Sequence, residues 1–91
     1  MGQASPDVAA LIATAAPAQT FGEKAVGLSF NPSGFDKVNQ AKIMYANMID
    51  MLNDLRNDPA SSGEKKRLAS VAITEAQGAQ MWAVKALTWK D

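Results

Sequence analysis

Residues 36–57, DKVNQAKIMYANMIDMLNDLRN, carry the pattern that decides the fold of this protein. Apolar side chains recur there at alternating spacings of three and four, at Val38, Ala41, Tyr45, Met48, Leu52 and Leu55. This spacing places the side chains on one face of an α-helix. Met44 and Met51 widen the apolar face, so we expect more than a single partner helix to cover it.

A second long helix is predicted on the C-terminal side of this segment. The stretch NDPAS interrupts the first helix, because Pro59 cannot continue it. Ser61 and Glu64 have the spacing of a capping box, so the second helix should begin near Ser62 and run to about Lys90. Its expected packing stripe is rich in alanine: Leu68, Ala72, Ala76, Ala79, Trp82 and Ala86. The two helices and their tight turn predict an antiparallel hairpin.

Turn-forming residues dominate the segment before the hairpin. Residues 20–35, TFGEKAVGLSFNPSGF, contain the unit NPSG, whose chemistry is typical of a turn. Residues 1–19 form an Ala-rich lead in which a short helix should start at Ser5 and stop at Pro17. We therefore expect an all-α fold, with a hooked N-terminal helix before the long hairpin and one domain over residues 20–91.

Composition limits both stability and partners. A chain of 91 residues without cysteine or histidine has neither disulfides nor the usual metal clips, so oligomerisation is the remaining means of stabilisation. Two helices with wide apolar faces cannot enclose a core, which predicts an obligate homo-oligomer. The net charge of zero argues against binding to polymeric nucleic acid. Without a run of apolar residues long enough to span a membrane, a soluble cytoplasmic protein is expected.

Catalysis is poorly supported by the sequence. The absence of His and Cys removes the common nucleophile–base pairs. Asp50 and Asp54 lie one turn apart, but both fall on the polar side of the predicted helix, where solvated carboxylates are the rule. No phosphate loop or metal-binding cluster is present. We expect a protein that is not an enzyme and needs no cofactor or metal ion.

Two groups of side chains leave a choice between structure and ligand binding. Lys65, Lys66 and Arg67 fall in the first turns of a helix, where cations oppose the helix dipole. They form either a solvated face or an anion site. Trp82 and Trp89 either pack at an interface or offer a surface for stacking.

Several stretches together resemble one known family. GLSFNPSG, the helix KVNQAKIMYANMIDMLNDLR and the segment RLASVAITEAQGAQMWAVKALTW are similar to the phage anti-CBASS cyclic-oligonucleotide sponge family, of the hook-domain type, over roughly residues 26–90. The resemblance implies helical hairpins assembled as compact homo-oligomers, typically hexamers. It also implies that the chain acts in the cytoplasm of the infected bacterium. There it would bind cyclic di- and trinucleotide messengers, such as 3′,3′-cGAMP and cyclic tri-adenylate, without cleaving them, and so block effector activation.

The resemblance also implies two sets of ligand-binding residues. For a cyclic dinucleotide the matching positions are Phe30, Asn31, Lys42 and Trp82. For a cyclic trinucleotide, in a separate site where several subunits meet, they are Arg67 and Thr74. Phe30 stands where the family often has tyrosine, so base stacking is kept and the phenol hydroxyl is lost. Lys42 matches the phosphate-binding lysine, with Lys37 as the alternative.

A rival hypothesis comes from a different class of protein. The apolar stripes of the predicted helices would also suit a non-catalytic helical protein that only oligomerises or binds a partner helix. That protein would not depend on its cations for activity, whereas a sponge for charged messengers would.

Overall fold

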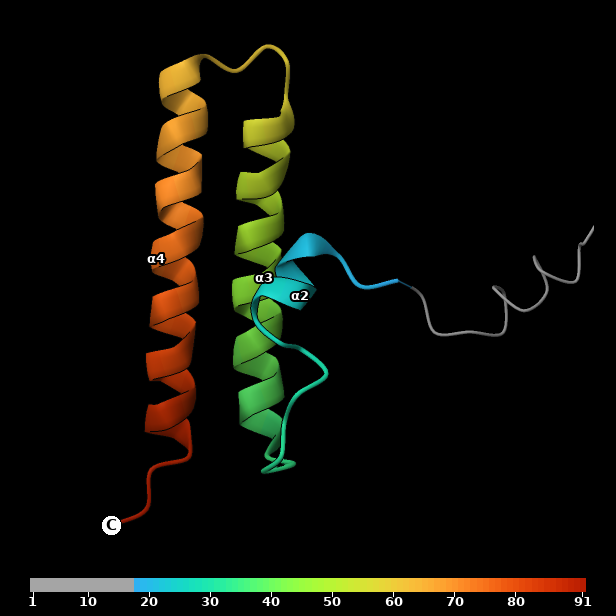
Figure 1. Ribbon diagram of the computed structural model, residues 1–91. Helices are drawn as coiled ribbons and strands as arrows, with labels where there is room; N and C mark the ends of the chain where they lie inside the picture. Colours follow the sequence, from blue (N-terminus) through green and yellow to red (C-terminus); the bar gives the residue numbers. More distant parts are fainter. Residues whose placement is uncertain (1–17) are drawn as a thin grey trace, which may run out of the picture.

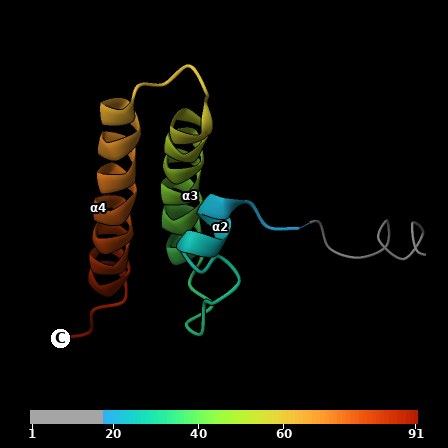
Figure 2. The same ribbon diagram turned by 45° about the horizontal axis from the view of Figure 1, so that its top comes forward.

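The computed structural model describes residues 18–91, which fold into three helices and contain no strand. These are α2 (Phe21–Ala25), α3 (Asp36–Asn57) and α4 (Gly63–Leu87). α3 and α4 run antiparallel side by side, and α2 packs crosswise near the middle of α3 (Figures 1 and 2). The predicted all-α hairpin is thus confirmed. The helix predicted between Ser5 and Pro17 lies outside the described residues.

The ends of the hairpin helices follow from two adjacent serines. Ser62 is the N-cap of α4, and its hydroxyl accepts a hydrogen bond from the Lys65 N–H at 3.1 Å. Ser61, the expected start of a capping box, instead donates its hydroxyl to the carbonyl of Leu55 at 2.7 Å. One serine therefore closes the end of α3 and the next opens α4. The expected position of the turn is correct, but the capping residue is one position further along.

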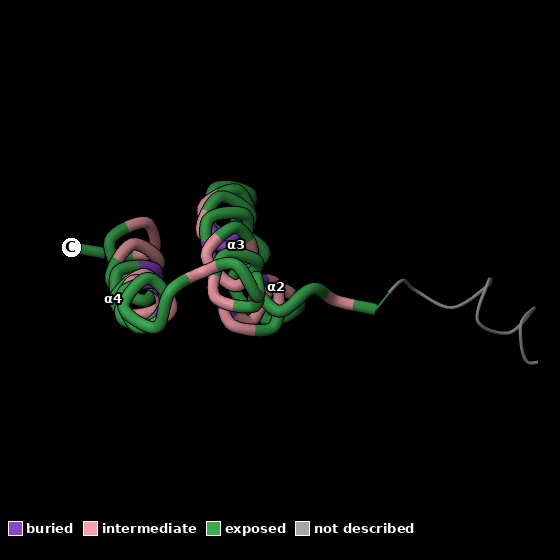
Figure 3. Tube along the Cα trace, turned by 90° about the horizontal axis from the view of Figure 1, so that it is seen from above, coloured by how far each residue is buried: buried purple, intermediate pink, exposed green. Residues whose placement is uncertain are grey.

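The core lies where the three helices meet, and its register differs from the predicted stripe. Its buried side chains are Val26, Ala46, Ile49 and Ile73. Met48, which the stripe placed inside, is 51% exposed, whereas its neighbour Ile49 is fully buried. The difference arises because α2 packs on the Ala46 side of α3 and draws that side into the core. Figure 3 shows the buried positions turned inward and the outer sides of the hairpin exposed.

The short helix α2 was missed by the sequence analysis, although its start carries a recognisable signal. Thr20 and Glu23 form a reciprocal capping box: the Thr20 hydroxyl accepts from the Glu23 N–H at 3.1 Å, and the Glu23 carboxylate accepts from the Thr20 N–H at 2.9 Å. Such a box satisfies two backbone donors at the helix start. The Gly and Pro content of residues 20–35 concealed a helix of only five residues.

Two contacts hold α2 against the hairpin. The N–H of the buried Gly22 donates to the Asp50 carboxylate at 2.7 Å, so this carboxylate has a structural partner. The Arg56 guanidinium lies 5.1 Å from the centre of the Phe21 ring and donates to the Ser70 hydroxyl of α4 at 3.1 Å. Arg56 thereby links all three helices. Among residues 18–91, no helix is both long enough and apolar enough to span a membrane.

Gly22 has no room for a side chain, which gives a test of α2 docking. A Cβ at this position would lie 2.1 Å from the carbonyl oxygen of Ala46, a backbone atom that cannot move aside cheaply. We expect Gly22→Ala to lower the free energy of unfolding by about 1–3 kcal/mol, the usual cost of overpacking. Urea denaturation followed by circular dichroism measures this change.

Gly63→Ala is the matched control, because a Cβ on this helical glycine meets nothing within 4 Å. Its stability should stay unchanged or rise slightly. Equal stability of the Gly22→Ala and Gly63→Ala proteins would contradict the described docking of α2.

Candidate functional site

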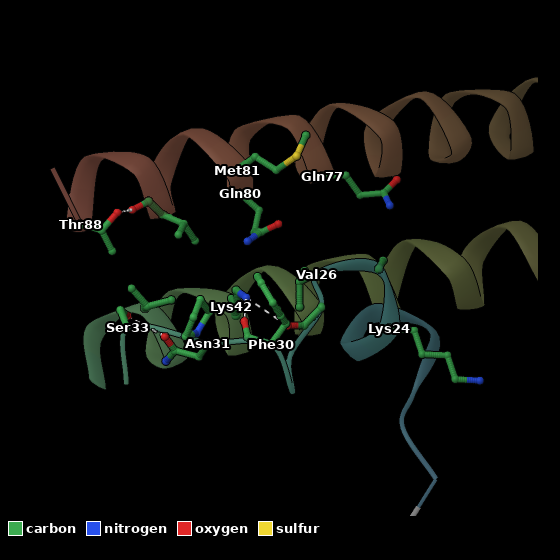
Figure 4. A pocket seen from close by; sticks show the side chains of 15 residues that line it. Lys24, Val26, Phe30, Asn31, Ser33, Lys42, Gln77, Gln80, Met81 and Thr88 are labelled. Carbon is green, nitrogen blue, oxygen red and sulfur yellow. Dashed lines mark hydrogen bonds between the residues drawn. The ribbon is translucent and has the colours of Figure 1, made fainter. Parts of the chain in front are cut away.

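A groove of about 670 Å³ runs between α4 and the turns that connect α2 to α3. One side consists of residues 24–27 and 30–33 together with Val38 and Lys42 of α3. The opposite side is provided by α4 and its C-cap, through Gln77, Gln80, Met81, Val84 and Thr88. Figure 4 shows these two sides facing each other across the groove.

The NPSG unit forms the predicted turn and shapes one end of the groove. The Gly34 N–H donates to the Asn31 carbonyl at 3.1 Å, and Gly34 has a φ of 64°, which favours glycine. The Asn31 amide donates to the Phe35 carbonyl at 3.1 Å and accepts from the Ser33 hydroxyl at 2.7 Å. Asn31 thus lines the groove while ordering its own turn, and its carboxamide keeps one further donor and one acceptor lone pair.

Phe30 presents an open aromatic surface at the groove. The residue is 70% exposed, and the Lys42 ammonium nitrogen lies 5.6 Å from the centre of its ring. A cation at this distance is attracted by the electrons of the ring face. An exposed ring beside a cation can stack on a flat, electron-rich group such as a nucleobase.

Lys42 is the only cationic side chain that is buried among the described residues, with 5% of its surface exposed. Its ammonium donates to the Gly27 carbonyl at 3.0 Å and to the Phe30 carbonyl. These bonds fasten both ends of the Gly27–Phe30 turn to α3. Because an ammonium has three donors, one remains for a ligand. Lys37, the sequence alternative, is exposed and does not line the groove.

Trp82 is not brought to the groove by this chain. It is 72% exposed and does not appear among the groove residues. It is two residues from both Gln80 and Val84, which line the groove, and two residues turn a helix by about 200°. Trp82 therefore lies on the opposite side of α4, and its predicted contact with a ligand stays a prediction that would need a second chain.

Arg67 and Thr74 lie on α4 away from the groove. Seven residues separate them, so they share one face of α4 and lie about 10 Å apart along the helix axis. Gln80, which lines the groove, is about 20 Å from Arg67 along the same axis. The Thr74 hydroxyl donates back to the Ser70 carbonyl at 3.2 Å. The structure therefore brings together Phe30, Asn31 and Lys42 and keeps Arg67 and Thr74 as a separate pair, whose trinucleotide role stays a prediction.

Arg67 forms an exposed ion pair with Glu64. Its guanidinium donates to the two carboxylate oxygens at 3.0 and 2.7 Å. The hydrogen bond from Arg67 lowers the pKa of Glu64, and the bond to Glu64 raises the pKa of Arg67. Because the carboxyl pKa is lowered, the ion pair stabilises the fold at pH values above the ordinary pKa of glutamate. This stabilisation is lost as the pH falls through the lowered pKa. At neutral pH, a ligand phosphate would compete with Glu64 for this guanidinium.

The sequence analysis missed Gln80 as a groove residue. Gln80 is 5% exposed and lies on the same buried face of α4 as Ala69 and Ile73. The sequence does contain a signal for it, because Gln80 continues the three- and four-residue spacing of the apolar residues Ala69, Ile73 and Ala76. Within residues 18–91, no three His, Cys, Asp or Glu side chains are grouped so that they could hold a metal ion.

The fold and groove define a small helical-hairpin domain that offers an aromatic ring, a cation and carboxamides to a ligand. The family model described as Acb2/Tad1, hairpin domain, matches residues 23–88, and the chain belongs to this family. The resemblance to the phage anti-CBASS sponge family is thereby confirmed. Comparisons with curated proteins and with solved structures give no significant match.

Proposed function

We propose that this protein is a phage immune-evasion protein that sequesters cyclic di- and trinucleotide messengers, such as 3′,3′-cGAMP and cyclic tri-adenylate. Binding removes the messenger from the cytoplasm of the infected bacterium, so CBASS effectors are not activated. The observation that carries the proposal is the exposed Phe30 ring beside the Lys42 ammonium, in a groove of an Acb2/Tad1 hairpin domain.

The chemistry of the groove suits a cyclic dinucleotide. Such a ligand has flat bases, which stack on aromatic rings, and phosphates, which bind cations. The groove volume of about 670 Å³ falls within the range of ordinary small-molecule sites. Its lining contains no carboxylate, so no like charge faces a phosphate.

The same lining supports binding without cleavage. No His, Cys, Asp or Glu lies among the groove residues, so the usual general bases for phosphodiester hydrolysis are missing there. The residues can orient and hold a ligand, and we infer that the messenger is released unchanged when the protein unfolds.

The outer face of the hairpin supports assembly into a homo-oligomer, proposed to be a hexamer. Met48 is two residues from Ala46 and Asp50, which contact α2, so it lies on the side of α3 turned away from α2. Exposed apolar residues continue along this side of α3 and along the side of α4 opposite the groove: Met44, Met51, Leu55, Leu68, Val71 and Trp82. Exposed apolar side chains gathered along one face are typical of a surface that another chain covers.

Assembly would also complete the ligand sites. One groove contains one exposed aromatic ring, whereas a cyclic dinucleotide has two bases. We therefore propose that a second chain contributes to each dinucleotide site and that its Trp82 is part of that contribution. Arg67 and Thr74 from several copies would converge on a cyclic trinucleotide. In the single chain each Arg67 guanidinium is paired with Glu64, so a ligand phosphate would replace that carboxylate as its partner.

The rival function, a non-catalytic helical interaction protein, is favoured by the same apolar face. It gives no role to the Phe30 ring, since this side chain is 70% exposed and stabilises little in the single chain. Binding measurements on Phe30 variants therefore separate the two functions.

Phe30→Ala tests the groove directly. Because stacking on an aromatic side chain contributes about 1–3 kcal/mol per base, affinity for 3′,3′-cGAMP should fall by about 5- to 150-fold. Isothermal titration calorimetry gives the dissociation constants. Phe35→Ala is the matched control, because Phe35 belongs to the same loop and does not line the groove. Unchanged affinity in Phe30→Ala would exclude the proposed stacking, and a wild-type protein that binds no cyclic nucleotide would exclude the sponge.

Met48→Lys tests the assembly face. A lysine in a buried apolar interface is unpaired and costly, so the oligomer should dissociate while the helical circular dichroism spectrum remains. Light scattering at micromolar concentration should give six times the chain mass for the wild type and a lower mass for the variant. Ala60→Lys, in the exposed turn between α3 and α4, should keep the wild-type mass. A monomeric wild type would contradict the proposed assembly.

A further inference from the structure

Gln80 is a buried polar side chain without a partner among the described residues. It is 5% exposed, and no hydrogen bond joins its side chain to any residue between 18 and 91. It extends from α4 into the groove, toward the side that carries Lys42 and Phe30 (Figure 4). Its carboxamide is therefore directed at the space that a ligand would fill.

Packing alone does not explain a carboxamide at this position. An amide that was withdrawn from water without a hydrogen bond would destabilise the fold. Over the described residues, no fully buried side-chain nitrogen or oxygen lacks a partner, so the Gln80 amide must still reach the open groove. Ile73 and Ala76 on the same face of α4 are apolar and pack against the core, whereas Gln77 and Gln80 line the groove with carboxamides.

We propose that Gln80 determines base specificity by pairing with the edge of a purine that is stacked on Phe30. A carboxamide offers one donor beside one acceptor, which matches the adjacent N6 amine and N7 nitrogen of adenine. The corresponding edge of guanine presents two acceptors, O6 and N7, of which the carboxamide satisfies one. We place the N7 edge of the base toward Gln80, and with this edge the groove prefers adenine. This inference rests on the proposed function of the groove as a cyclic dinucleotide site.

Gln80→Met removes the donor and the acceptor and keeps the length of the side chain. Calorimetry on wild type and variant, with cyclic di-AMP and cyclic di-GMP as separate probes, measures the effect. The wild type should bind cyclic di-AMP more tightly. In the variant, affinity for cyclic di-AMP should fall about tenfold or more, while affinity for cyclic di-GMP changes less. Gln40→Met, on an exposed part of α3 outside the groove, should keep the wild-type ratio of affinities.

The thermal stability of Gln80→Met separates this role from a structural one. A side chain whose amide serves only a ligand can be replaced by methionine with an unchanged or higher melting temperature in the absence of nucleotide. A lower melting temperature, together with equal losses of affinity for both probes, would overturn the inference and make Gln80 a packing residue.

The remaining outcomes distinguish this inference from the proposed function. The inference about Gln80 is wrong if the wild type binds both probes equally, or if the variant keeps the wild-type ratio of affinities. Neither result contradicts the proposed sequestration of cyclic nucleotides. A wild type that binds neither these probes nor any other cyclic nucleotide overturns both.

Discussion

The buried ammonium of Lys42 is the contact on which the candidate site depends. Its hydrogen bonds to the carbonyls of Gly27 and Phe30 fasten this turn to α3, beside the apolar packing of Leu28 on the core. A buried charge of this kind is tolerated because polar groups surround it. The bonds also fix the Phe30 backbone at the edge of the groove and leave one ammonium donor unused. The same residue thus builds the turn and supplies a buried positive charge to the site.

The two sides of the hairpin have different chemistry, and this division suits a binding protein that assembles. One side carries α2, the turns and a groove in which one aromatic ring, lysine and several carboxamides lie among mainly apolar side chains. The other is dominated by methionine, leucine and tryptophan side chains that the single chain leaves exposed. Trp82 belongs to the second side, so its proposed contribution to a ligand site requires a neighbouring chain. Folding of one chain therefore prepares a groove, and assembly would complete it.

The sequence predicted those features that depend on neighbouring residues. The bounds of α3, the break at Pro59 and the turn at Asn31–Gly34 follow from helix periodicity and turn chemistry, and the structure confirms them. The predicted stripe of α3 was right in part: Val38 is buried and Tyr45 and Leu52 pack against the core. It missed Ala46 and Ile49, whose burial depends on the docking of α2 through Gly22. Lys42 was expected from the family resemblance to bind phosphate, and its bonds to two carbonyls become visible only in the folded chain. Gln80 was missed because a glutamine on an apolar face shows its purpose only when the groove beside it is known.

The central claim is that the protein captures a cyclic messenger and leaves it intact. Incubating the purified protein with 3′,3′-cGAMP, isolating the complex by gel filtration and denaturing it with heat tests this claim most directly. Chromatography of the released nucleotide should show unchanged 3′,3′-cGAMP in the protein fraction. A linear or hydrolysed product would contradict the account by showing catalysis, and a protein fraction free of nucleotide would contradict it by showing that nothing is captured.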